Sequence, residues 1–159
     1  MKAALVYFGN SKESLNKFND EIKKWSGLEN LDLASFVSTN DKYEWKTKTW
    51  KKEKFFDQKE IYKVTCLDFG IKHNILRNFN LHNLKPTVLN LSSSFEDIIE
   101  TKPDGIFLSN GPGDPAATGK YSIKIINELI KRNLPIFGIC LGHQILALAL
   151  GGKTTKMKL

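Results

Sequence analysis

The stretch PIFGICLGHQILALALGG at residues 135–152 contains the signals that decide the fold. A short apolar run, typical of a buried strand, is followed by an apolar segment long enough for a helix, which the glycines at 151–152 are placed to end. Between the two lies Cys140, with Gly138 and Gly142 two residues away on either side. The order of strand, tight turn and helix predicts an α/β unit with a cysteine held at the turn.

The same alternation of strand and helix extends upstream to residue 61. Parallel strands need crossover connections, which helices supply, so the pattern predicts a doubly wound, mostly parallel sheet. The expected strands are residues 62–69, 87–91, 105–109 and 135–139. The expected helices have apolar faces at Ile71, Ile75, Leu76 and Phe79, at Ile98 and Ile99, at Ile123, Ile126, Leu129 and Ile130, and in residues 141–150.

Residues 1–60 have a different pattern and are predicted to form the end of a smaller domain plus a linker, with residues 61–159 as the second domain. The expected elements are an amphipathic helix from Ser11 to Trp25 that Gly27 ends, a helical turn from Leu31 to Phe36, a half-buried strand through Tyr43, Trp45 and Thr47, and a lysine-rich linker at 46–59.

Composition fits a globular protein, with 41% hydrophobic and 26% charged residues in a chain of 159. No stretch has the roughly 20 apolar residues that a membrane span requires, and the N-terminus has no signal-peptide pattern, so a cytoplasmic location is expected. The two cysteines are expected to be reduced, and no Cys and His residues have zinc-site spacing. The net charge of +7 is concentrated at 46–59, which favours a solvated linker and leaves nucleic-acid binding as a distant alternative.

The turn at Cys140 places the cysteine where an α/β enzyme holds its nucleophile. The N-terminus of the following helix favours the reactive thiolate, and the N–H of Leu141 points to where an oxyanion forms during attack on a carbonyl. A plain core cysteine is the alternative, because most cysteines in apolar segments are buried. Cys66, which lies within an expected strand without flanking glycines, is predicted to be such a core residue.

The loop SNGPGDP at 109–115 follows the third expected strand and is the second candidate part of the site. Its glycines, Gly111 and Gly113, expose N–H groups that could supply another oxyanion donor, although a loop of this composition is often only a connector. His143 is only three residues from Cys140, so we expect it to pack rather than to act as the base. His73 and His82 are expected to face solvent.

These segments resemble the class I, or triad, glutamine amidotransferases and, more narrowly, the small subunits of carbamoyl phosphate synthases. The resemblance covers nearly the whole chain and implies an incomplete amidotransferase sheet preceded by the end of an N-terminal domain. It is carried by GICLGHQ (138–144) and LSNGPGDP (108–115) for the wider family, and for the narrower one by CLDFGIKHNILR (66–77), PDGIFLSNGPGDP (103–115), GGKTTKMK (151–158), GLENLDLASFVST (27–39) and YEW (43–45).

The resemblance implies glutamine hydrolysis to glutamate and ammonia through a thioester on Cys140. It places oxyanion donors at the N–H groups of Leu141 and Gly111, and glutamine-binding residues at Gly111, Gly113, Leu141 and Gln144. Ammonia would pass to a large synthetase subunit, which would use ATP, Mg²⁺ and bicarbonate to make carbamoyl phosphate for arginine and pyrimidine biosynthesis. No cofactor or metal is expected in this chain.

In the family that the chain resembles, the triad His and Glu lie well beyond the cysteine, and an earlier part of the N-terminal domain precedes the segment found here. The resemblance therefore implies a chain truncated at both ends. Because triad members act as a unit, the isolated chain is expected to have negligible glutaminase activity. Two further interpretations stay open. One is another class I amidotransferase with a different synthetase partner, and the other is a non-enzymatic flavodoxin-like module in which Cys140 is a core residue.

Overall fold

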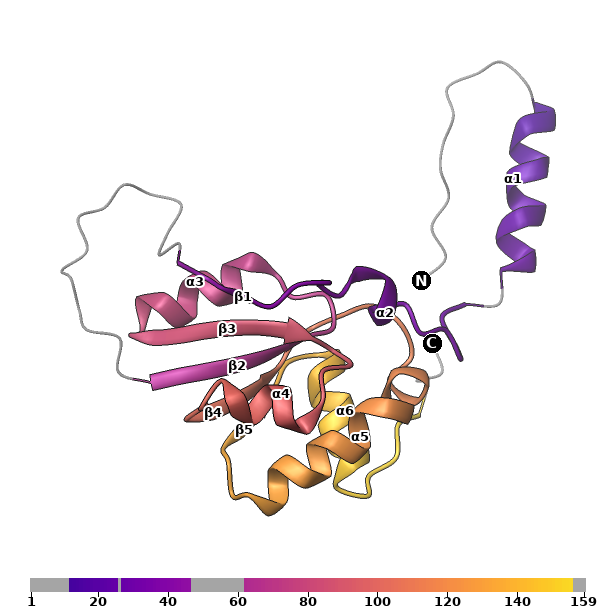
Figure 1. The fold of residues 1–159 in the computed structure, drawn as a ribbon. Coiled ribbons are helices and arrows are strands. Elements are labelled where there is room, and N and C mark those ends of the chain that lie inside the picture. Colours follow the sequence, from indigo (N-terminus) through magenta and orange to yellow (C-terminus); the bar gives the residue numbers. More distant parts are fainter. Residues whose placement is uncertain (1–11, 26, 47–61, 156–159) are drawn as a thin grey trace.

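The computed structural model describes residues 12–25, 27–46 and 62–155, and the side chains of residues 12–15 are not described. These residues form one sheet with helices on both of its faces (Figure 1). In chain order the elements are α1 (Lys12–Lys24), α2 (Ala34–Val37), β1 (Tyr43–Glu44), β2 (Tyr62–Asp68), α3 (His73–Leu81), β3 (Leu84–Asn90), α4 (Phe95–Glu100), β4 (Gly105–Leu108), α5 (Pro115–Lys131), β5 (Ile136–Gly138) and α6 (Leu141–Ala149).

The sheet confirms the predicted α/β architecture. Its five strands lie in the order β1-β3-β2-β4-β5, and every neighbouring pair is parallel except β1 with β3. Consecutive parallel strands are connected through helices, with α3 between β2 and β3, α4 between β3 and β4, and α5 between β4 and β5. The carboxyl ends of β2, β4 and β5 therefore meet at one edge of the sheet, where open α/β sheets bind their ligands.

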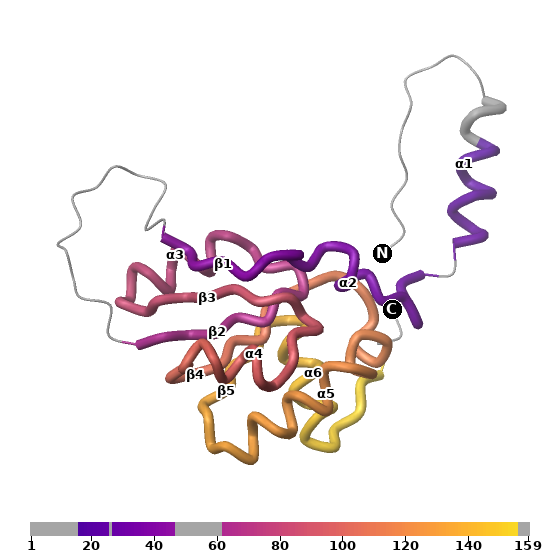
Figure 2. Tube along the Cα trace, in the orientation of Figure 1, coloured from indigo at the N-terminus to yellow at the C-terminus, as the bar shows by residue number. Residues whose placement is uncertain are grey.

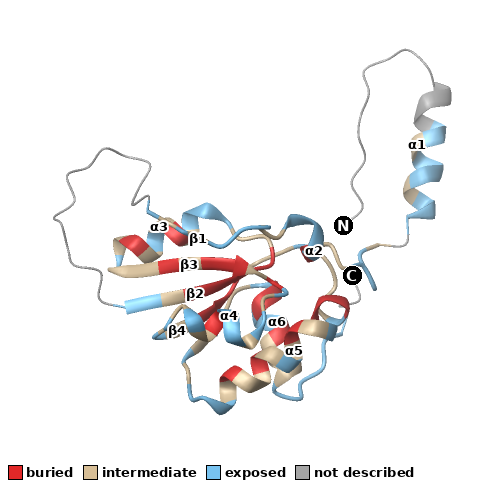
Figure 3. Cartoon of the chain, viewed as in Figure 1, coloured by how far each residue is buried: buried red, intermediate tan, exposed pale blue. Residues whose placement is uncertain are grey.

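Side chains of successive strand residues enter two separate cores, one on each face of the sheet. Leu67, Ile106 and Leu108 pack with residues of α4, α5 and α6, whereas Cys66 and Phe107 pack with residues of α3. Figure 3 shows buried residues along β2 and β3 and on parts of α5 and α6. This arrangement explains why the strands read as near-continuous apolar runs in the sequence, because both faces are covered.

The predicted element boundaries differ from the observed ones in several places. β3 begins at Leu84 rather than at residue 87, so that Pro86 lies inside a strand that pairs on both sides. Proline is rare in the interior of a sheet because it has no N–H to donate. Here the carbonyl of Pro86 still accepts a hydrogen bond from the Trp45 N–H at 3.1 Å. The helical turn expected at 31–36 lies at α2, and β5 is shorter than residues 135–139.

Residues 27–46 lie beside the sheet and contribute its edge strand β1. They run along the sheet from α2 to β1, which pairs with β3 (Figure 2). The predicted helix at 11–25 is confirmed as α1, which stands apart from the sheet in Figure 1. Thr47 and almost all of the lysine-rich linker lie outside the described residues, so the domain division at residue 60 stays a prediction.

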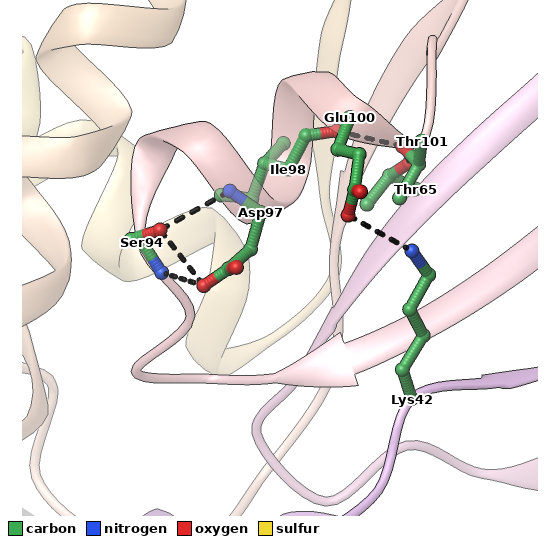
Figure 4. Close-up of polar contacts among 7 residues, drawn as sticks. All are labelled: Lys42, Thr65, Ser94, Asp97, Ile98, Glu100 and Thr101. Carbon is green, nitrogen blue, oxygen red and sulfur yellow. Dashed lines mark hydrogen bonds and ion pairs between the residues drawn. The ribbon is translucent and has the colours of Figure 1, made fainter.

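Helix α4 begins at a reciprocal hydrogen-bonded cap. The Ser94 hydroxyl accepts a hydrogen bond from the Asp97 N–H at 3.1 Å, and the Asp97 carboxylate accepts one from the Ser94 N–H at 2.9 Å (Figure 4). An ion pair of 3.6 Å between Lys42 and Glu100 joins this helix to the chain before β1. These contacts fix the crossover from β3 to β4. None of the helices in the described ranges has the length and apolar character to cross a membrane.

Candidate active site

Cys140 lies between β5 and α6 with an unusual backbone conformation. Its φ is 53° and its ψ is −113°. Residues that carry a side chain rarely adopt a positive φ. Such conformations cost of order 1–3 kcal/mol and persist only where the surrounding structure enforces them. The residue is exposed, in contrast to the fully buried Cys66. The strained turn therefore presents the Cys140 thiol to solvent at the carboxyl edge of the sheet.

The flanking glycines are required by close backbone contacts. A Cβ atom on Gly138 would lie 2.6 Å from the His143 nitrogen, and one on Gly142 would lie 2.7 Å from the Ser109 oxygen and still closer to the Leu108 oxygen. These contacts are with backbone atoms, which cannot move aside as a flexible side chain could. A residue with a side chain at either position would therefore collide with the backbone of the turn or of the end of β4.

The turn at Cys140 is joined to the end of β4. The Ile139 N–H donates to the Leu108 oxygen at 3.1 Å, and the Gly142 N–H donates to the Ser109 oxygen at 3.0 Å. For the Leu141 N–H, no hydrogen-bond acceptor is found within residues 12–25, 27–46 and 62–155. This donor at the start of α6 is therefore available to a negatively charged oxygen beside Cys140.

The loop after β4 is fixed by polar contacts with the loop after β2. The Ser109 hydroxyl accepts a hydrogen bond from the Phe69 N–H at 2.9 Å and donates to the Asn110 oxygen at 2.8 Å. The Asn110 side chain donates to the Gly70 oxygen at 2.8 Å and accepts from the Lys72 N–H at 3.1 Å. The backbone that carries Gly111 and Gly113 is consequently held on both sides.

The structure brings two of the five predicted site residues into one cavity of about 440 Å³. Gly113 and Gln144 line it, whereas Cys140, Leu141 and Gly111 do not. Gln144 lies one helical turn after Cys140, and its N–H donates to the Cys140 oxygen at 3.0 Å. The cavity thus lies one turn along α6 from the thiol. The remaining lining residues are Leu28, Glu29, Asn30, Asp114, Pro115, Ala116, Thr154 and Thr155.

Several of these lining residues could not be found from the sequence. Leu28, Glu29 and Asn30 come from the segment before α2, far from the 109–115 loop in the chain. Thr154 and Thr155 follow the pair of glycines after α6. No local pattern marks any of them, because their place in the cavity depends on how distant segments pack together.

The two thiols have different environments. Burial raises the pKa of Cys66, and the nearby Asp68 carboxylate raises it further, so this thiol stays protonated and unreactive. The prediction that Cys66 is a core residue is confirmed by its complete burial. Asp68 itself accepts backbone hydrogen bonds from Thr39, Gly70 and Ile71 at 2.7–2.8 Å, a structural role in shaping the loop after β2.

Within the described ranges no group of three His, Cys, Asp or Glu side chains is placed to hold a metal ion. His143 is exposed on α6, so the expectation that it packs is wrong. His73 and His82 are exposed at the two ends of α3, as expected. No hydrogen bond joins the Cys140 thiol to a histidine in this part of the chain. The structure therefore presents an exposed thiol beside a backbone N–H that has no acceptor in the described residues, and a cavity of about 440 Å³ lies next to them.

Comparisons with known proteins agree with this arrangement. Residues 65–159 match the family model described as glutamine amidotransferase class-I. The chain is 50% identical over 141 residues to the carbamoyl phosphate synthase small chain of Rhizobium meliloti, covering 86% of this chain and 35% of that protein. It is 46% identical over 157 residues to the small chain of Bradyrhizobium diazoefficiens, covering 98% of this chain and 40% of that protein.

A third relative is the carbamoyl phosphate synthase small chain of Agrobacterium fabrum. It is 47% identical over 159 residues, covering 98% of this chain and 40% of that protein. The chain thus spans about 35–40% of the length of the curated relatives described here. The family match includes the turn at Cys140, the loop after β4 and the parallel strands from Thr65 in β2 onward. The chain therefore belongs to the class-I glutamine amidotransferases.

Proposed function

We propose that this chain carries the nucleophile and oxyanion half of a glutaminase site. The Cys140 sulfur attacks the side-chain amide carbon of glutamine, and the N–H groups of Leu141 and Gly111 stabilise the negative oxygen that forms. When this tetrahedral intermediate collapses, the C–N bond breaks, and the amide nitrogen takes up, through water, the proton that the Cys140 thiol gave up and leaves as ammonia. Water then cleaves the thioester, releasing glutamate and restoring the thiol.

The observation that carries this proposal is the strained, exposed turn at Cys140 beside an N–H group that is available as a donor. The positive φ of 53° at Cys140 destabilises the fold, and a cysteine that only packed in the core would not require this conformation. Gln144 and Gly113 on the neighbouring cavity support a substrate whose amino-acid end binds one helical turn from the sulfur. Glutamine has this shape, because two methylene carbons and the α-carbon separate its amide from its charged groups.

The partner that we propose is a large synthetase subunit, because the relatives are named as small chains of carbamoyl phosphate synthase. Ammonia released at Cys140 would be used there with bicarbonate and ATP, and Mg²⁺ would bind with the nucleotide on that partner. The assembly would be a heterodimer working in the cytoplasm, in arginine and pyrimidine biosynthesis. Another class I amidotransferase with a different synthetase partner is the competing assignment.

We further propose that the 159 residues alone hydrolyse glutamine very slowly. The described residues place no histidine in hydrogen-bond contact with the Cys140 thiol, so proton transfer would rely on water. Removal of a base from a nucleophile–base pair typically costs several powers of ten in rate. The helix N-terminus behind Cys140 favours the thiolate and leaves the first, bond-forming step accessible.

The test is release of ¹⁵N-labelled ammonia from amide-labelled glutamine by the chain alone, by its Cys140→Ser variant, and by each mixed with a carbamoyl phosphate synthase large subunit. We expect slow turnover by the chain alone that Cys140→Ser abolishes. Turnover that Cys140→Ser leaves unchanged would refute the assignment of the nucleophile. Transfer of the label to carbamoyl phosphate in the mixture would favour this partner over other synthetases.

A further inference from the structure

The segment from residue 28 to residue 32, here called the strap, lies against the loop after β4. The Asn30 N–H donates to the Asp114 carboxylate at 2.7 Å, and the Asp114 N–H donates to the Leu31 oxygen at 2.9 Å. The other oxygen of this carboxylate accepts a hydrogen bond from the Ala116 N–H at 2.8 Å and caps α5. Asp114 thus joins the strap and the N-terminus of α5 through separate oxygens of one side chain.

A second carboxylate anchors the other end of the strap. Asp32 accepts hydrogen bonds at 2.9 Å from the Thr118 hydroxyl and from the Tyr121 hydroxyl, both of which lie on α5. Burial acts to raise the pKa of Asp32, but the hydrogen bonds from Tyr121, Thr118 and Ser35 outweigh it and hold this pKa below its usual value. The strap is therefore attached at two residues, Asn30 through the N-cap of α5 and Asp32 directly to α5.

Gly113 lies against the backbone of the strap with no space for a side chain. A Cβ atom at this position would be 2.7 Å from the Leu31 oxygen and 2.9 Å from the Leu33 nitrogen. The φ of Gly113 is 105°, in a region that other residues rarely adopt. The orientation of the peptide groups around Gly113 is consequently set by the strap as well as by the loop's own sequence.

The strap also forms one wall of the cavity next to Cys140. Leu28, Glu29 and Asn30 line it on one side, with Gly113 and Gln144 among the residues that complete it. A molecule bound there would contact the strap and the loop at the same time. Displacement of the strap would therefore change the shape of the cavity and the position of Gly113 together, while the turn at Cys140, held by β4, would keep its own contacts.

We propose that the strap positions the Gly113 backbone for glutamine, with Asp114 and Asp32 as positioning residues that act through the loop and α5. This inference rests on the proposed glutaminase function. It assigns to residues 28–32 a part in substrate affinity, separate from the reactivity of the Cys140 thiol. A misplacement of binding groups by about 1 Å can cost on the order of a hundredfold, so a displaced strap is enough to weaken glutamine binding measurably.

The test separates thiol reactivity from glutamine affinity in the same chain. Asn30→Pro removes the N–H that bonds to Asp114 and cannot adopt the φ of 63° found at Asn30, whereas Asn30→Gly keeps both. Asp32→Ala removes the second anchor, and Asp20→Ala, on the exposed helix α1, serves as the control for loss of an aspartate. Two rates are measured by mass spectrometry: alkylation of Cys140 by iodoacetamide, and its protection by increasing glutamine.

We expect Asn30→Pro and Asp32→Ala to raise the glutamine concentration that gives half-protection by about tenfold or more. The iodoacetamide rate without glutamine should stay within about twofold, and Asn30→Gly should recover most of the protection. Hydrogen exchange of the Asp114 amide, slow in the unaltered chain, should become fast in Asn30→Pro. Fast exchange of this amide shows that the strap has detached, and an unchanged iodoacetamide rate shows that the turn at Cys140 keeps its structure.

Three outcomes overturn the inference in distinguishable ways. If glutamine protects Cys140 equally well in Asn30→Pro, in which the Asp114 amide exchanges fast, the strap has no part in binding and only this inference fails. If glutamine protects Cys140 in none of the chains, the proposed glutaminase function fails and the positioning role fails with it. Fast exchange of the Asp114 amide in the unaltered chain would also contradict the attachment of the strap to this loop.

Discussion

The sharpest prediction from the structure concerns Gly142, which packs against the end of β4. An added Cβ would lie 2.5 Å from the Leu108 carbonyl carbon and 2.7 Å from the Ser109 oxygen, and real Cβ atoms are essentially never within 3.0 Å of such atoms. Gly142→Ala therefore requires the turn at Cys140 to move away from β4 by about half an ångström or more. The same movement lengthens the hydrogen bond of 3.0 Å between the Gly142 N–H and the Ser109 oxygen.

The expected magnitude follows from this displacement. Overpacking of this kind typically costs about 1–3 kcal/mol in the free energy of unfolding, which urea denaturation measures. The displaced Leu141 N–H and Cys140 thiol should lower the rate of Cys140 labelling by a glutamine-mimicking diazo-ketone by about tenfold or more. Labelling is followed by mass spectrometry on the folded chain.

The matched control is Gly105→Ala at the start of β4. Its added Cβ would lie 3.5 Å from the Pro135 oxygen, an ordinary contact, so stability and labelling should both change little. If Gly142→Ala were labelled at the rate of the unaltered chain with unchanged stability, the turn would not be held against β4 as described. Loss of labelling in Gly105→Ala as well would mean that the assay reports general unfolding.

Three further predictions concern stability. Phe107→Ala should lower the free energy of unfolding by about 3–5 kcal/mol, because Phe107 is only 1% exposed. Phe137→Ala should lower it far less, because Phe137 is 63% exposed, and urea denaturation measures both changes. Ser94→Ala should cost about 1 kcal/mol through loss of the α4 cap, read from the same curves, and an unchanged midpoint would contradict the cap. Because the folded-state pKa of Asp32 is lowered, its carboxylate stabilises the fold above its unfolded-state pKa, and this contribution is lost as the pH falls through the lower folded-state pKa. When the pH is lowered below about 4, the free energy of unfolding should therefore fall less in Asp32→Asn than in the unaltered chain. The same dependence of this free energy on pH in both proteins would contradict the hydrogen-bonding role of Asp32.

The sequence predicted those features that depend on local periodicity. The alternation of apolar runs and amphipathic segments placed β2, α3, α5 and α6 correctly, because strands buried on both faces and helices buried on one have distinct patterns. The turn at Cys140 was predictable for the same reason, since its two glycines and the adjoining strand and helix lie within a few residues of each other.

Features that depend on contacts between distant segments were not predictable. Asn30 and Asp114 are 84 positions apart, and neither residue has a neighbouring pattern that indicates its partner. The early start of β3 was missed because Pro86 argues against a strand, and only the pairing with β1 and β2 overrides that preference. The cavity residues Thr154 and Thr155 were missed for the same physical reason, because tertiary packing alone brings them to Gln144.

The most direct test of the central claim is labelling of the folded chain with the glutamine-mimicking diazo-ketone, mapped residue by residue by mass spectrometry. The account predicts modification of Cys140 that glutamine suppresses, and no modification of Cys66, which is fully buried and has a raised pKa. Equal labelling of both thiols, or labelling of Cys140 that glutamine does not reduce, would contradict the claim that Cys140 is the nucleophile of a glutamine site in this chain.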